Sequence, residues 1–439
     1  MPTYYLELAL RSLKRSPGLT ALMVLAIGFG VAASMTTYSV FRAVSGDPIP
    51  WKSSKLFVPQ IDIWGPAVRN GSGEPADALD YTDAMALMRD HRATRQSALY
   101  EVDPTIVVPG RGDDSFSVDG YAVAGEFFPM LDIPFTYGSG WSANDDAQAA
   151  TVAVISAELN QQLFGGSNSV GKVVQIGDKD YRIVGVMGAW DPQPRYYDVF
   201  GSGGFRSDTP DIFLPLNRAI AAGMENDGRT NCGTAEPTEK GFVGMQKSSC
   251  AWLSFMVELD DAAAVVRYRQ YLDGYARDQQ AKGRFTWAPN NRLRDLPTFL
   301  DFEQVVPSDT KVSLLVALGL LVVCMVNTVG LMLAKFLRRS GEIGVRRALG
   351  APRRAICAQF FSEAGLIGLF GGLLGLLFTV AGVSCVGLVL PVSIAALAKI
   401  DLPLLGITLL VAIAASLLAA LYPTFRASRV QPAWQLKSN

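Results

Sequence analysis

The sequence has a single histidine, His91, and only five cysteines among its 439 residues. One imidazole excludes a metal site built on several histidines and argues against a histidine-dependent catalytic triad. A hydrophobic content of 49% excludes a disordered chain, and the lack of a short repeat excludes a collagen-like one. We expect His91 to cap a helix or face solvent, and we assign no catalytic residue and no metal site.

Acidic residues are nearly absent outside the middle of the chain. Residues 45–311 hold 24 basic and 36 acidic side chains, a net charge of −12, whereas the remaining segments hold 15 basic and 4 acidic ones, a net charge of +11. The overall net charge of −1 is therefore the sum of two opposite blocks, which indicates two different environments. Because the large polar block is acidic, nucleic acid is excluded as a partner.

Four uncharged apolar runs are long enough to cross a bilayer, which takes about 20 residues. They lie between Arg15 and Arg42, from Val312 to Ala334, after Glu363, and between Asp401 and Arg426. Pro391 should end the third helix near Leu390, and Pro403 suits the first turn of the fourth. The first run is far longer than the apolar core of a cleaved signal peptide, so we expect it to be an anchor.

The short polar segments between these runs predict their orientation. Basic residues crowd the two termini and the loop between the second and third runs: Arg11, Lys14, Arg15, Lys335, Arg338, Arg339, Arg346, Arg347, Arg353, Arg354, Arg426, Arg429 and Lys437. The opposite short loop offers only Lys399. The positive-inside rule then places both termini in the cytoplasm and the acidic block outside, in the periplasm or exterior.

The acidic block begins and ends with similar patterns. LFVPQIDIW, LDYTDAMALMRDH and SALYEVDPTIVVPG read as strand, helix and strand, and AWLSFMVELD, VVRYRQYLDGYARDQQ and GRFTWAP repeat that order later. Between them lie short strands and turns, such as GKVVQIGDKDYRIVGVM and DIFLPL. The predicted fold is an α-helical membrane protein with four transmembrane helices and a large external α+β domain. That domain consists of a split β-α-β subdomain and a β-rich insertion.

Several short motifs have a chemical reading and a simpler structural one. GSNSVGK at residues 166–172 resembles a phosphate-binding loop, but Val173 stands where Ser or Thr would bind magnesium, so we interpret it as a turn. Cys232 and Cys250 form a candidate disulfide in an oxidising compartment, the alternative being two free thiols. Asn327, inside the second run, indicates helix packing or a substrate contact. Gly371 and Gly375, four residues apart, predict close helix approach.

The loop between the second and third runs contains KFLRRSGEIGVRRALGAPRRAICAQFFSE. We expect a short amphipathic helix from Glu342 to Leu349, a stop at Gly350, and Pro352 in the first turn of the next helix. Ile356 and Phe360 then share a face. A membrane anchor needs basic residues but not this punctuation. The pattern favours a rigid elbow that receives force from a cytoplasmic partner.

Four segments resemble one known family. EIGVRRALGAPRRAICAQFFSEAGLIGLFGGLLGLLF is similar to the coupling segment and third span of FtsX-like/MacB-type ABC transporter permeases, and YPTFRASRVQPAWQLK to their C-terminal ending. LALRSLKRSPGLTALMVLAIGFGVAASM resembles their N-terminal elbow helix and first span. TVAVISAELNQQLFGGSNSVGKVVQIGDKDYRIVGVM resembles the MacB-like periplasmic core domain. The stretch from Trp190 to Cys250 matches poorly apart from DIFLPL.

The resemblance implies a division of the chain into five parts. These are an elbow helix with the first span (1–44), the first half of a porter-like subdomain (45–110), a β-rich sabre-like subdomain (111–249), the second porter-like half (250–311), and an FtsX-like domain with the remaining spans (312–439). It also implies an ATPase-coupling site at Glu342, Ile343, Arg346, Arg347, Ala348, Leu349, Gly350 and Ala351.

The resemblance implies partners as well. They are two copies of a cytoplasmic ABC ATPase, a second permease, identical or related, forming a dimer, and membrane lipid. MacB carries its ATPase in the same chain, whereas this sequence has no such domain, so we expect a separate ATPase that binds ATP and magnesium. We expect no cofactor bound by this chain itself.

The leading hypothesis is a permease subunit of the bacterial cell inner membrane. Cytoplasmic ATP hydrolysis would move its periplasmic domain (mechanotransmission) to drive export of a substrate, with a periplasmic adaptor and an outer-membrane channel as further partners. The alternative is a signalling scaffold that activates a periplasmic cell-wall hydrolase and transports nothing. A membrane-anchored extracellular enzyme is a third hypothesis, and no constellation of nucleophile, base or metal ligands in the sequence favours it.

Overall fold

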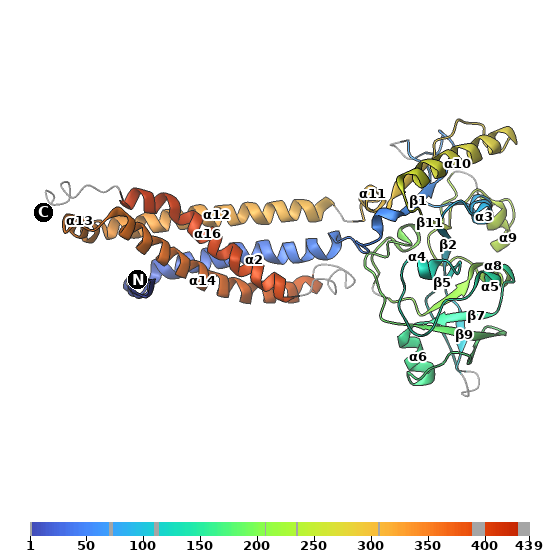
Figure 1. Ribbon diagram of the computed structural model, residues 1–439, viewed down its shortest axis with the longest axis horizontal. Helices are drawn as coiled ribbons and strands as arrows, with labels where there is room; N and C mark the ends of the chain where they lie inside the picture. The colour runs from blue at the N-terminus through green and yellow to red at the C-terminus, as the bar shows by residue number, and fades with distance from the viewer. Residues whose placement is uncertain are drawn as a thin grey trace. The chain divides into compact units, whose positions relative to one another are not determined.

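The computed structural model describes residues 2–69, 73–108, 114–206, 208–233, 236–305, 308–388 and 400–428. The chain forms two compact units, one of residues 47–305 and one of residues 1–46 together with residues 306–439. We call them the α/β unit and the helical unit, and each is described by itself (Figure 1).

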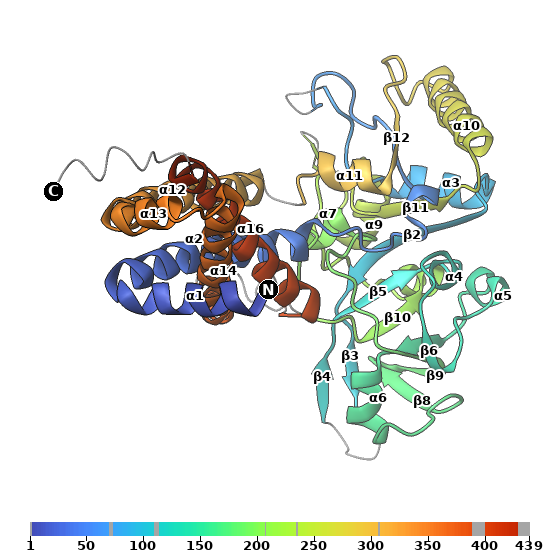
Figure 2. The same ribbon diagram turned by 60° about the vertical axis from the view of Figure 1, so that its left-hand side comes forward.

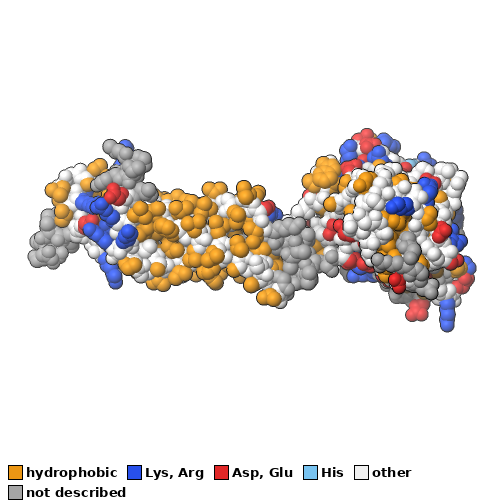
Figure 3. Space-filling view, turned by 90° about the horizontal axis from the view of Figure 1, so that it is seen from below, with side chains coloured by type: hydrophobic (Ala, Val, Ile, Leu, Met, Phe, Trp, Pro, Cys, Tyr) orange, Lys and Arg blue, Asp and Glu red, His pale blue; other side chains and the backbone are white. Residues whose placement is uncertain are grey.

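Long apolar helices build the helical unit. Its described elements are α1 (Pro2–Arg15), α2 (Pro17–Ser45), α12 (Ser308–Arg338), α13 (Ser340–Ala348), α14 (Arg353–Cys385), the 3-10 turn η2 (Val386–Leu388) and α16 (Leu402–Ser428). Helices α2, α12, α14 and α16 are each long and apolar enough to cross a membrane, as the sequence predicts. Figure 3 shows their apolar side chains as a belt, with Lys and Arg side chains gathered at one end of it.

Prolines lie in the first turns of two spans, and the position of Pro403 was predicted from the sequence. Pro17 begins α2 and Pro403 is the second residue of α16, positions that lack an intrahelical N–H bond in any case. The predicted end of the third span at Pro391 and the family-like ending beyond Ser428 lie outside the described residues.

Glycines let α14 approach α2 closely, as predicted from their spacing. A side chain at Gly371 would come within 3.0 Å of Ile27, and one at Gly375 within 3.2 Å of the Gly28 carbonyl. The partner helix therefore lies in this chain. Such small-residue contacts let membrane helices gain van der Waals energy from backbone proximity.

The described strands of the α/β unit form one sheet of twelve strands in the order β12-β1-β11-β2-β5-β10-β7-β9-β8-β3-β4, with β6 beside β9. The strands are β1 (Leu56–Gln60), β2 (Arg95–Val102), β3 (Thr105–Val107), β4 (Ser115–Ser117), β5 (Gly120–Val123), β6 (Phe135–Gly138), β7 (Val152–Ile155), β8 (Val173–Ile176), β9 (Lys179–Met187), β10 (Ile212–Pro215), β11 (Ser254–Glu258) and β12 (Arg292–Asp295). Figure 2 shows the strands and the surrounding helices.

The helices of this unit are short except for one. They are η1 (Ser53–Lys55), α3 (Tyr81–Asp90), α4 (Phe127–Met130), α5 (Ala143–Ala147), α6 (Ala157–Phe164), α7 (Val199–Ser202), α8 (Leu216–Ala221), α9 (Gly241–Lys247), α10 (Ala262–Ala281) and α11 (Leu296–Phe302). His91 caps the C-terminus of α3, as one of the two predicted roles requires, and its ring contacts Glu126 at 2.9 Å.

Two β-α-β units interleave at one end of the sheet, as predicted. β1-α3-β2 and β11-α10-β12 combine in the antiparallel order β12-β1-β11-β2, so segments far apart in sequence complete one subdomain. Neighbouring residues of β2 point to opposite faces of the sheet. Tyr100 packs in the hydrophobic core under α3 and α10, and Leu99 packs in a second core on the other face. Both faces of β2 are therefore buried.

One expectation about this unit was wrong. The last strand was predicted at GRFTWAP, but it is β12, which pairs with β1; Phe285 and Trp287 instead stack on each other in the core. The β-rich insertion continues the same sheet, because β5 pairs with β2. GSNSVGK is a turn between α6 and β8, as interpreted from the sequence.

Candidate coupling site

Helix α13 forms the elbow between α12 and α14. It begins at Ser340, two residues before the predicted start, and Leu349 caps its C-terminus. Gly350 follows with φ +94°, a left-handed conformation that glycine adopts without steric cost. Pro352 is the N-cap of α14 and so lies just before the first turn, where it was predicted to lie within it. Its ring sets the direction in which the chain leaves the elbow.

One face of α13 is held in a small apolar core. Ile343 is buried with Phe336 of α12 and Ile356 of α14, and Phe360 packs beside them, as the shared helix face of Ile356 and Phe360 predicts. The rings of Phe336 and Phe360 lie 6.2 Å apart. Burying such side chains contributes about 1.5–3 kcal/mol each. The elbow is therefore packed against both of the helices that it joins.

A buried polar cluster ties the same end of the helical unit together. Lys335 of α12 and Glu363 of α14 are 4% and 3% exposed and form an ion pair. The Ser12 hydroxyl of α1 donates to Glu363 at 2.7 Å, and Arg339 donates to Ser12 at 2.5 Å. Elements separated by more than 300 residues thus meet at one carboxylate, which the sequence does not reveal.

Charged residues of α13 are paired with this cluster. Glu342 accepts from Arg339 at 3.3 Å and forms ion pairs with Arg346 at 3.2 Å and with Arg15 of α1 at 3.5 Å. Arg346 also donates to Gln359 of α14 at 3.1 Å. Glu342 and Arg346 therefore hold the elbow in place besides being candidates for partner contact.

The outward face of α13 is apolar. Val345 is 54% exposed and Leu349 is 82% exposed, and four residues of separation place them on one side of the helix. Of the eight predicted coupling residues, Ile343 is buried, Glu342, Arg346, Arg347 and Ala351 are half-buried, and Ala348, Leu349 and Gly350 are exposed. Val345 is not among these eight, but its spacing from Leu349 places it on the same exposed side.

Asn327 packs against no other helix of the described residues. It lies on the exposed side of α12 beside Val323 and Val326, and its amide makes no hydrogen bond with the described residues. In the most apolar stretch of α12, 22% is buried within the structure, against 39–44% in the other three spans. Any helix that satisfies this amide must therefore come from another chain or from the undescribed residues.

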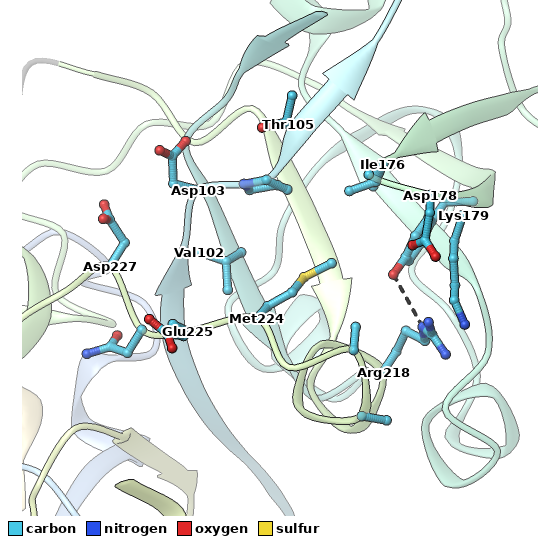
Figure 4. Close-up of a pocket in the computed structure, with 16 residues that line it drawn as sticks. Val102, Asp103, Thr105, Ile176, Asp178, Lys179, Arg218, Met224, Glu225 and Asp227 are labelled. Carbon is cyan, nitrogen blue, oxygen red and sulfur yellow. Dashed lines mark hydrogen bonds between the residues drawn. The ribbon is translucent and has the colours of Figure 1, made fainter. Parts of the chain in front are cut away.

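The α/β unit has an open cleft of about 610 Å³ beside β2, β9 and α8 (Figure 4). Its lining includes Asp103, Asp178, Glu225 and Asp227. The Arg218 guanidinium donates to the Tyr181 hydroxyl at 3.2 Å, which places one of the few cations of the cleft against its wall. Residues 218–227 belong to the stretch that resembles the family least. The described lining residues include no Ser–His or Cys–His pair.

Models of two protein families match the chain. The MacB-like periplasmic core domain matches residues 20–275, and the FtsX-like permease C-terminal region matches residues 314–432. The chain belongs to the family of FtsX/MacB-type ABC permeases. The first match extends over more than half of the chain, and the second contains the whole elbow.

Individual relatives of this permease are distant. The macrolide export ATP-binding/permease protein MacB of Sodalis glossinidius (strain morsitans) is 24% identical over 86% of this chain and 52% of the relative. The protein of the same description from Shewanella sp. (strain W3-18-1) is 26% identical over 69% of the chain and 39% of the relative. The chain thus spans about half the length or less of these curated relatives.

A solved structure aligns with part of the chain. The crystal structure of the periplasmic region of MacB from Actinobacillus actinomycetemcomitans aligns with a TM-score of 0.36 and 14% identity, over 58% of this chain and 94% of that one. Together with four helices apolar enough to span a membrane, the family assignment fits an inner-membrane permease with a periplasmic-type domain.

The permease's two candidate disulfide cysteines are bonded in the structure. Cys232 and Cys250 are joined across 18 residues, and Cys250 is fully buried next to the core residues Ala251 and Trp252. Replacing both cysteines by serine should lower the free energy of unfolding of the α/β unit by about 3 kcal/mol, because the unfolded chain regains the entropy of that loop. Urea unfolding followed by tryptophan fluorescence would measure the loss. A thiol count of five on the denatured, unreduced permease would contradict the bond.

Buried carboxyl groups should make the permease's α/β unit sensitive to pH. Burial, reinforced by the neighbouring Asp198, raises the pKa of Glu101 from 4.5 to about 7, and burial with Asp83 raises that of Asp80 from 3.8 to about 7. Both groups bind protons more tightly when folded than when unfolded. Their stabilising contribution is complete below about pH 4 and is lost as the pH rises through about 7.

We therefore expect the α/β unit to unfold at lower urea concentration at about pH 8 than at about pH 5. The slope should reach up to about 1.4 kcal/mol per pH unit for each such group. Glu101→Gln should flatten this dependence, and Glu225→Gln, a change in the open cleft, should leave it unchanged. A dependence equally steep in wild type and Glu101→Gln would rule Glu101 out as a source.

Proposed function

We propose that this chain is the membrane-spanning subunit of an ABC transporter complex. A separate ATPase binds the elbow at α13, and its ATP-driven motion changes the conformation of the periplasmic domain to drive export of a substrate. The observation that carries the proposal is the construction of the elbow, which presents the exposed apolar pair Val345 and Leu349 above a packed core around Ile343.

The contacts behind the elbow support transmission of force. α13 cannot move freely, because its Ile343 packs on Phe336 of α12 and its Glu342 forms an ion pair with Arg15 of α1 and bonds to Arg339, the N-cap of α13. Arg339 in turn reaches Ser12 and, at 3.8 Å, Glu363 of α14. A push on α13 therefore acts on three other helices through short polar contacts and the apolar core.

Charge supports the orientation with both termini in the cytoplasm. The basic side chains that flank the apolar belt gather at the α13 end (Figure 3), the pattern that the positive-inside rule associates with the cytoplasmic side. The α/β unit then faces the periplasm, an oxidising compartment in which the Cys232–Cys250 bond persists.

The exposed face of α12 supports a dimer of permeases. Val316, Val323 and Asn327 follow one another at helical spacing on that face. An amide exposed to hydrocarbon gains a hydrogen-bond partner when a second helix packs against it. We propose that α12 contacts a second permease, identical or related, and that Asn327 lies in this contact.

Affinity purification of the full chain from mild detergent tests the proposal. We expect an ABC ATPase to co-purify in a stoichiometry of two per permease dimer, and its absence would overturn the assignment. A co-purifying periplasmic adaptor and outer-membrane channel would support export. A peptidoglycan hydrolase in their place would favour the alternative of a signalling scaffold.

Reversing the two elbow arginines tests coupling more directly. Arg346→Glu with Arg347→Glu should abolish the ATP-dependent change in protease sensitivity of the periplasmic domain. The carboxylate introduced at position 346 would repel Glu342, and the bond that Arg346 donates to Gln359 would be lost. The matched control is Arg353→Glu with Arg354→Glu, two exposed residues at the start of α14. If the elbow double variant still responds to ATP like wild type, the coupling assignment is wrong.

A further inference from the structure

A pocket of about 570 Å³ lies in the helical unit, between the corner of α1 and α2 and the end of α12. It is lined by Arg15, Ser16, Pro17, Gly18, Leu19, Leu22, Lys335, Arg338, Arg339 and Glu342. In the proposed coupling mechanism Arg339 and Glu342 connect the helices, but the pocket itself has no role. Its composition, four cations beside an apolar wall, points to a ligand with an anionic head and an apolar tail.

The pocket has a surplus of positive charge. Among the described residues, Arg15, Lys335, Arg338 and Arg339 are opposed by the carboxylates Glu342 and Glu363, and Glu342 is shared with Arg346. Lys335 already forms an ion pair with Glu363. Arg338, by contrast, is exposed and makes no ion pair with the described residues. A bound anion would offset this surplus of positive charge.

The N-terminus of α2 adds to the positive potential of the pocket. Ser16 is the N-cap of this 29-residue helix, but its side chain bonds to no backbone N–H, and its buried hydroxyl oxygen has no hydrogen-bond partner among the described residues. The uncapped first turn carries partial positive charge from its free N–H groups. The Ser16 hydroxyl is thus a buried, unpaired polar group in the wall of a cationic pocket.

The apolar wall continues along the membrane span. Leu22 is 54% exposed, and Leu25 and Phe29 follow it on the same face of α2 at 47% and 58% exposure. These side chains form a stripe from the pocket into the apolar belt, along which an acyl chain can lie. A free phosphate or a nucleotide would make no use of this stripe.

We propose that the pocket binds the phosphate head of an anionic phospholipid in the leaflet at the α13 end, with an acyl chain along Leu22, Leu25 and Phe29. Basic pockets beside membrane helices hold anionic headgroups in this way. The lipid would bridge α1–α2 and α12, next to the elbow, so the lipid composition of the membrane would influence the stability of the coupling region. This inference does not depend on which ATPase or substrate the permease uses.

Native mass spectrometry of the full chain in detergent tests the site. The probes are phosphatidylglycerol and phosphatidylcholine with identical acyl chains. We expect phosphatidylglycerol to remain bound to wild type at activation energies that strip phosphatidylcholine. Arg15→Gln with Arg338→Gln should reduce the retained phosphatidylglycerol about tenfold or more. The single variant Arg338→Gln, which breaks no ion pair among the described residues, should show a smaller loss in the same direction.

The matched control removes two charges at the same end of the unit but outside the pocket, by Arg353→Gln with Arg354→Gln. Full retention in this control would support a specific site. An equal loss in both double variants would overturn the proposal in favour of a general basic surface. Displacement of the lipid by millimolar inorganic phosphate, or equal retention of phosphatidylcholine, would overturn it as well.

Discussion

Replacing Val345 and Leu349 together by aspartate should abolish co-purification of the ATPase while the permease still folds. Both side chains are exposed, so aspartate at these positions faces water in the free permease. In the complex it would bury two carboxylates against the partner. Truncating a hot-spot residue of an interface costs about 2 kcal/mol or more, so the pair should weaken binding by up to about a thousandfold.

Titration of detergent-solubilised permease with the ATPase, followed by light scattering or calorimetry, would measure this change. The matched control is Val170→Asp with Val173→Asp, another exposed apolar pair, located in the α/β unit. It should leave ATPase binding unchanged. Wild-type affinity in the elbow variant would show that α13 does not carry the contact.

Glu363→Gln should destabilise the helical unit by about 3–5 kcal/mol, because it leaves the buried Lys335 ammonium without its counter-charge. Glutamine keeps the size of the side chain and can still bond to Ser12, so the loss reports charge rather than packing. Helix content followed by circular dichroism, during titration from mild detergent into sodium dodecyl sulfate, would measure the stability.

The double variant Lys335→Met with Glu363→Gln distinguishes charge pairing from general damage. Without the buried ammonium there is no unpaired charge, so most of the lost stability should return. If the double variant is as unstable as Glu363→Gln alone, the ion pair is not the source of the effect.

The four spans follow from composition alone, because each apolar run is long enough to satisfy its own backbone within a helix. The elbow also follows from local sequence, because Gly350 readily adopts the left-handed conformation that ends α13. The β-α-β units were recognisable by period, but the position of β12 was not. Its RLRD sequence has little strand character, and pairing with β1 decides its structure.

The coupling site divides in a similar way. The position of the α13 elbow could be predicted, since amphipathic spacing and helix-ending residues are encoded within about ten residues of one another. The roles of its members could not, because Ile343 and Leu349 look alike in sequence, and packing buries one and exposes the other.

The sequence by itself determined the spans, the polarised charge and the elbow, all of which depend on neighbours within a few turns of chain. Only the tertiary structure decided the Lys335–Glu363 pair with Ser12, the continuous sheet through β2 and β5, and the basic pocket at Arg15 and Arg338. These features join residues far apart in the chain. Such pairings depend on how whole elements pack, which local propensity does not encode.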